Sequence, residues 1–87
     1  MEDDLIKAII EQLRRERYAE GKIDDFYVQL DLGFEFTKDF IGYYVRARVR
    51  KGSVAKEGKR RFSMMEEAEE YFEKLIAEYG LKEAIGI

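Results

Sequence analysis

Residues 26–50 read FYVQLDLGFEFTKDFIGYYVRARVR, two runs of alternating apolar and polar side chains separated by a short turn. Successive side chains of a β-strand point to opposite faces of a sheet, so this alternation is typical of half-buried strands. The sequence therefore predicts strands over 24–36 and 41–51, joined as an antiparallel hairpin. In the register that pairs Phe36 with Ile41, the apolar residues of both strands share one face.

The polar face of the hairpin supports the same register independently. This register sets Asp31 opposite Arg46, Gln29 opposite Arg48, Tyr27 opposite Arg50, and Gly33 opposite Tyr44. Opposite charges, and an aromatic ring that covers a glycine, are favourable cross-strand pairs. Because the register was chosen from the apolar face alone, the agreement on the polar face strengthens the prediction.

A helical pattern precedes the hairpin. Its apolar residues recur at helical spacing and form the stripe Leu5, Ile6, Ile9, Ile10 and Leu13. This periodicity predicts an amphipathic helix over 4–20, and Gly21 is a suitable residue to end it.

A third strand and a second helix follow the hairpin. After a glycine-containing loop over 52–58, a short strand is predicted over 58–62 and a helix over 64–79. Ser63 and Glu66 have the spacing of a capping box at the start of that helix. Gly80 ends it, and Leu81 is placed for the apolar contact of a Schellman stop. Residues 81–87 form a short tail, in which Ile85 and Ile87 could dock or fray.

These elements predict one domain over residues 1–87, because a chain this short cannot bury two cores. The fold class is α+β, in the order α-β-β-β-α. Each helix has one apolar stripe and the sheet has one apolar face. The expected arrangement is therefore a three-stranded antiparallel meander with two helices packed on one face.

The composition argues against an enzyme and against most cofactors. The chain has no His and no Cys, so it lacks the residues of catalytic triads and of imidazole or thiolate metal sites. We expect no cofactor, no membrane insertion and a cytoplasmic location. Charged residues make up 40% of the chain and Pro and Trp are absent, which fits either a thermophile protein or an engineered sequence.

Charge is strongly segregated along the chain. Residues 42–62 carry eight bases against one acid, whereas residues 1–35 and 63–87 are both acidic. Period-2 spacing places arginines on the outer side of the hairpin with tyrosines between them, a pattern that can contact phosphates and stack on bases. The predicted nucleic-acid-binding residues are Tyr27, Tyr44, Arg46, Arg48, Arg50, Lys59 and Arg61. The alternatives are a protein partner on this face, or a scaffold without a natural ligand.

Three segments resemble the arm-type, AP2-like DNA-binding domain of tyrosine integrases: GYYVRARV at 42–49, GKRRF at 58–62, and residues 67–72. The resemblance covers about residues 42–78. It implies a three-stranded sheet in the DNA major groove, with Tyr44, Arg46, Arg48, Lys59 and Arg61 facing the DNA. The order α-β-β-β-α is also similar to that of double-stranded RNA-binding domains. The last helix here begins MMEE at 64–67 instead of with that family's basic cluster.

Overall fold

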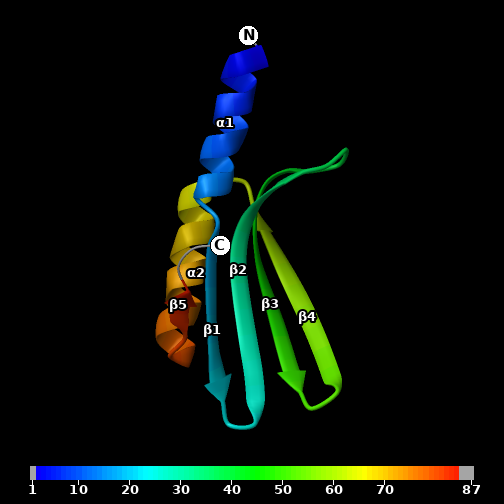
Figure 1. Cartoon of the computed structure of the whole chain (residues 1–87), viewed down its shortest axis with the longest axis vertical. Helices are drawn as coiled ribbons and strands as arrows, with labels where there is room; N and C mark the ends of the chain where they lie inside the picture. Colours follow the sequence, from blue (N-terminus) through cyan, green and yellow to red (C-terminus); the bar gives the residue numbers. More distant parts are fainter. Residues whose placement is uncertain (1, 85–87) are drawn as a thin grey trace.

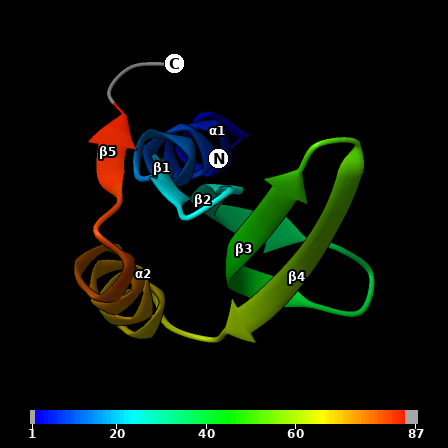
Figure 2. The same ribbon diagram turned by 90° about the horizontal axis from the view of Figure 1, so that it is seen from below.

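The computed structural model describes residues 2–84, which form an α+β fold around one antiparallel sheet. In chain order the elements are α1 (Glu2–Arg14), β1 (Arg17–Ile23), β2 (Phe26–Phe36), β3 (Ile41–Lys51), β4 (Val54–Phe62), α2 (Met65–Tyr79) and β5 (Lys82–Ala84). The strands lie in the order β4-β3-β2-β1-β5 (Figure 1). Helix α2 covers one face of this sheet (Figure 2).

The core lies between α2 and the sheet. Phe72 of α2 is completely buried, against Leu30, Leu32 and Val45 of the central strands. These strand residues belong to the apolar set that the alternation predicted. Burying side chains of this size contributes about 1.5–3 kcal/mol each, and this burial holds α2 on the sheet.

The predicted register of the central hairpin is confirmed. Strand β2 pairs with β3 so that Phe36 lies opposite Ile41 and Asp31 opposite Arg46. The remaining predicted partners also face each other, down to Tyr27 opposite Arg50 at the far end. The hairpin turn is closed by backbone and side-chain hydrogen bonds between Thr37 and Phe40.

The sheet has five strands, so the prediction of three was wrong. The first helix ends at Arg14 instead of continuing to residue 20, and residues 17–23 form β1 against β2. The apolar repeat of the helix stops at Leu13, while Ala19 is fully buried in the sheet. Gly21 lies within β1 and does not end a helix. Asp24 adopts a positive φ of 56° in the turn to β2, a conformation that Asp tolerates better than most residues.

The predicted strand over 58–62 is present but begins earlier, and part of the predicted tail forms a further strand. Residues 54–62 all belong to β4, which pairs with β3, so the expected loop over 52–58 shrinks to a tight turn. Gly52 makes this turn at a φ of +60°, the left-handed region that favours glycine. Residues 82–84 pair with β1 as β5, and Ile85 and Ile87 lie outside the described residues.

The sequence predicted the C-terminal end of α2 correctly but not its N-terminal cap. The residue that precedes the helix is Met64, in an extended conformation and without a side-chain cap hydrogen bond. Ser63 therefore stands one position too early, and the predicted capping box with Glu66 does not form. The C-terminal stop is confirmed, because Gly80 is left-handed and both Gly80 and Leu81 donate their backbone N–H to the carbonyl of Ile76. Leu81 is buried in the core, consistent with the apolar contact that commonly accompanies this motif.

Helix α1 does not share a face of the sheet with α2, contrary to prediction. It projects beyond the end of the sheet (Figure 1). Residues of α2 and the strands already fill the core on that face, where Phe72 packs against Leu30, Leu32 and Val45. In the part of the chain that the structure describes, the buried cluster includes no residue of α1. Neither helix in the described residues is long and apolar enough to cross a membrane.

Candidate functional site

All seven predicted binding residues lie on the sheet face opposite α2, which we call the outer face. Their positions in β2, β3 and β4 alternate with those of the buried core residues. The structure therefore places these residues on one face, as the sequence predicted, and α2 lies on the other side of the sheet (Figure 2). Sheet pairing aligns Asp31, Arg46 and Lys59 in one row across three strands.

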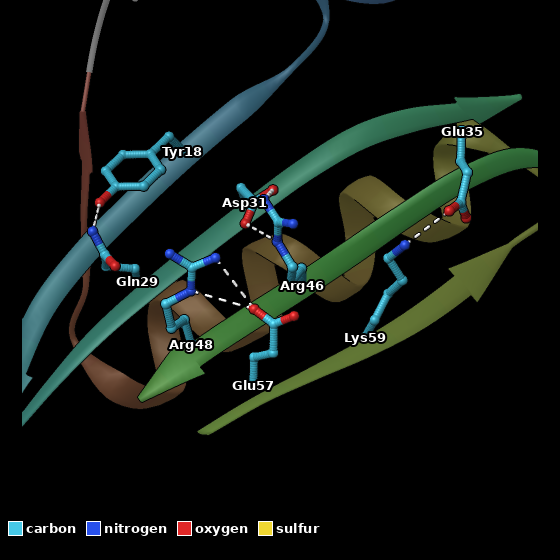
Figure 3. Close-up of polar contacts among 8 residues, drawn as sticks. All are labelled: Tyr18, Gln29, Asp31, Glu35, Arg46, Arg48, Glu57 and Lys59. Atoms are coloured by element: carbon cyan, nitrogen blue, oxygen red, sulfur yellow. Dashed lines mark hydrogen bonds and ion pairs between the residues drawn. The ribbon is translucent and has the colours of Figure 1, made fainter. Parts of the chain in front are cut away.

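Most of the basic side chains on the outer face are paired with acidic side chains within the molecule (Figure 3). Arg46 donates two hydrogen bonds to Asp31, each 3.1 Å long. Arg48 donates to Glu57 at 3.2 and 3.3 Å. Glu35 accepts from Lys59 at 2.8 Å and from Arg61 at 2.9 Å. The hydrogen bond from Arg61, followed by that from Lys59, lowers the pKa of Glu35.

Bases nevertheless outnumber acids on this face. The basic residues that strands β1–β4 place on this face are Lys22, Arg46, Arg48, Arg50, Lys59 and Arg61. The acidic residues there are Glu20, Asp31, Glu35 and Glu57. Exposed ion pairs contribute little to stability, so a competing anion can exchange for a carboxylate partner. The face thus keeps a modest positive excess in a chain of net charge −3.

The two predicted tyrosines are already stacked with cations. Arg46 lies 5.8 Å and Lys59 4.8 Å from the centre of the Tyr44 ring, which also covers Gly33. Arg50 lies 5.7 Å from the centre of the Tyr27 ring. Cation–π contacts of this kind stabilise both partners. A nucleic-acid base that stacked on either ring would have to displace a cation.

A polar network that the sequence did not reveal joins β1 to β2. Tyr18 donates to Glu20 at 3.0 Å, Gln29 donates to Tyr18 at 2.6 Å (Figure 3), and Tyr27 also donates to Glu20. The hydrogen bond to Glu20 raises the pKa of Tyr27 to about 12, with burial and the charge of Glu20 adding to the effect.

Replacing Glu20 by Gln should lower the pKa of Tyr27 toward the ordinary value of 10.0. In the wild type, the neutral phenol is favoured in the folded state. The interaction of the neutral Tyr27 phenol with Glu20 therefore stabilises the folded state fully below pH 10. This stabilisation is lost as the pH rises through about 12. Ultraviolet titration of the tyrosinates, compared with a Tyr27→Phe variant, identifies the transition. An unchanged titration in the Glu20→Gln variant would contradict this assignment.

The helix that projects from the sheet carries a row of exposed apolar side chains. Leu5, Ile6, Ile9, Ile10 and Leu13 form the α1 stripe, and each is between 42% and 63% exposed. The buried core cluster draws its residues from the sheet, α2 and Leu81. The apolar repeat is visible in the sequence, but its exposure is not, because an amphipathic repeat predicts an apolar face without showing what packs against it.

A groove of about 750 Å³ runs between the end of α1 and the outer face. Ile10 and Leu13 form an apolar wall, and Tyr18 and Tyr44 lie on the sheet side. Charged residues also line the groove; they are Arg14, Glu16, Arg17, Asp31, Arg46 and Arg48. The α1 stripe and the predicted basic residues therefore meet in one groove, a junction that the sequence did not predict.

No protein-family model, curated protein or solved structure matches this chain. The resemblances to integrase arm-type domains and to double-stranded RNA-binding domains therefore remain predictions. Within residues 2–84, no group of three or more carboxylates is placed to hold a metal ion.

Proposed function

We propose that this chain is a non-enzymatic protein-binding domain, and that its contact surface is the α1 stripe with the adjoining groove. The exposure of the stripe is the observation that carries the proposal. A helix as short as α1, with 13 residues, is marginal in water unless its apolar face is packed. Contiguous apolar patches on soluble domains mark interaction sites. A partner that covers the stripe would supply the packing that the sheet does not.

The chemistry of the groove suits an amphipathic helical partner. Such a helix can lay apolar residues against Ile10 and Leu13 while its polar side meets the sheet. Arg46 and Asp31 on the sheet side offer both signs of charge for hydrogen bonds at the rim of the contact. An apolar centre with a polar rim is the usual anatomy of a protein interface.

A photo-crosslinking experiment tests this function in cells that make the protein. The photoreactive residue p-benzoylphenylalanine is placed at Ile9 in the α1 stripe, with a control at Glu70 on the exposed side of α2. We expect a discrete adduct from position 9 and a much weaker one from position 70. If position 9 gives no adduct, or if positions 9 and 70 give the same adducts, the proposal fails.

Nucleic-acid binding through the outer face is the second candidate function. It is supported by the clustering of all seven predicted residues on one uncovered face where bases exceed acids. The internal ion pairs of Arg46 and Arg48 oppose it, because their carboxylate partners repel phosphates. For this reason it ranks below protein binding.

If this second function is correct, a labelled duplex should bind at low salt, and binding should weaken steeply as salt rises. Replacing Arg46, Arg48 and Arg50 together with Ala should reduce the slope of log K against log salt by about 3. A matched variant that replaces Lys7, Lys38 and Lys74 with Ala removes the same charge elsewhere and should leave most of the binding. Equal loss in both variants would indicate a nonspecific charge effect instead of a site.

A further inference from the structure

We infer that the partner of the α1 stripe is a second copy of this chain, paired through an antiparallel α1–α1 contact centred on Ile9. This inference rests on the protein-binding function proposed above and names its partner. Three observations support it: the symmetry of the stripe, the distribution of charge along α1, and the position of α1 relative to the sheet.

The stripe is symmetric about its middle residue. Leu5 and Leu13 lie four residues on either side of Ile9, and all three are exposed on the same side of the helix. Two antiparallel copies that cross at Ile9 would place Ile9 against its own equivalent and Leu5 against Leu13 of the other copy. A two-fold interface of this kind satisfies every contact twice and closes on itself.

The charges of α1 favour the antiparallel over the parallel orientation. The sequence is acidic at residues 2–4, where the helix begins, and basic at Arg14, where it ends, and Arg15 follows directly. In an antiparallel pair, the acidic start of each helix lies beside the basic end of the other, and the two helix dipoles oppose each other. A parallel pair would bring like charges together at both ends.

The groove continues this complementarity onto the sheet. Its lining contains Arg14, Arg17, Arg46 and Arg48 but only Glu16 and Asp31 as acids. The groove begins where α1 ends, so the acidic start of an antiparallel second α1 would lie at its mouth. The pairing would therefore cover the α1 stripe, including Ile10 and Leu13 where they line the groove.

The shape of the molecule leaves room for this arrangement. Because α1 projects beyond the sheet (Figure 1), two copies paired through α1 hold their sheets at opposite ends of the helix pair.

Light scattering coupled to gel filtration tests the assembly on the full chain. We expect twice the mass of one chain for the wild type, and a single chain mass for the Ile9→Glu variant, because two carboxylates then meet at the two-fold axis. Val54→Glu changes an exposed apolar residue on β4 and should remain dimeric. Circular dichroism of the sheet shows whether each variant is folded. A wild type that stays monomeric at 100 μM would overturn the inference.

Engineered cysteines test the orientation, since the chain has no cysteine of its own. The Ile9→Cys variant should oxidise to a disulfide-linked pair. Leu5→Cys and Leu13→Cys should each crosslink poorly alone but efficiently when mixed, because eight residues along a helix separate them by about 12 Å. Strong self-crosslinking of Leu5→Cys would indicate a parallel pair and contradict the assigned orientation.

The two sets of experiments separate failure of the dimer from failure of the proposed function. A monomer in solution, together with a position-9 adduct to a different protein, overturns the second-copy partner and leaves protein binding in place. A monomer without any position-9 adduct overturns both.

Discussion

Phe72→Ala should lower the free energy of unfolding by about 3–5 kcal/mol, the usual cost of emptying a buried phenylalanine site. Phe72 is completely buried between α2 and the sheet. Its ring also carries the guanidinium of Arg17 at 4.8 Å, and Arg17 in turn bridges Glu73 of α2 and Glu83 of β5. The substitution therefore leaves a cavity and loosens the contact between α2, β1 and β5.

For a domain of this length, such a loss lowers the melting temperature by on the order of 20 °C. Thermal and urea unfolding followed by circular dichroism measure it. Tyr79→Ala is the matched control, since it removes an aromatic ring from the same helix at a position that is 48% exposed. We expect it to cost about 1 kcal/mol. Equal losses for the two variants would show that α2 is not anchored through Phe72.

Gly42→Ala should also destabilise the fold strongly, by about 2–3 kcal/mol, through overpacking. A Cβ added at Gly42 would lie 2.6 Å from the backbone carbonyl oxygen of Phe62 and 2.7 Å from Cζ of Phe40. The ring of Phe40 can rotate away. The Phe62 carbonyl belongs to a paired strand, so relief requires β3 and β4 to separate at this end.

Gly58→Ala provides the comparison on the neighbouring strand. Nothing lies within 4 Å of a Cβ added at Gly58, so the substitution introduces no clash. It restricts the unfolded chain and should raise stability by about 0.4–1 kcal/mol. The two alanine variants are thus expected to change the urea midpoint in opposite directions. If both variants changed the urea midpoint in the same direction, the packing explanation would be refuted.

The central hairpin could be predicted from the sequence because both of its strands alternate without interruption. Only one register places the apolar side chains of β2 and β3 on the same face without a shift at the turn. The pairing of Asp31 with Arg46 agrees with that register. The C-terminal end of α2 was equally clear, since Gly80 followed by Leu81 satisfies the stop motif locally. These features depend on neighbouring residues alone.

Strand β1 and the first half of β4 escaped prediction because their packing does not demand large apolar residues. Next to α2 and β5, β1 needs small ones: Ala19 is buried, and a Cβ on Gly21 would lie 3.0 Å from Leu81. Strand β4 is exposed except at Phe62, so hydrogen bonding to β3 places it without any alternation. Hydropathy patterns do not register such strands.

The sequence predicted which residues share the outer face, but it did not predict all of their ion-pair partners or the position of α1 beside them. Period-2 spacing placed the seven residues on one face correctly. Glu57, the partner of Arg48, was missed because it fell in a predicted loop. The location of α1 could not be read from its stripe either, since an amphipathic repeat shows that a face is apolar and not what covers it.

The exposed fourth strand affects how the protein behaves when concentrated. As an outer member of the sheet, β4 presents backbone groups that could template a neighbouring strand and start fibrous aggregation. Lys56, Lys59, Arg60 and Arg61 lie along it with one acid, Glu57. Two such strands brought together would repel each other, so the charge of β4 acts as a gatekeeper against intermolecular sheet growth.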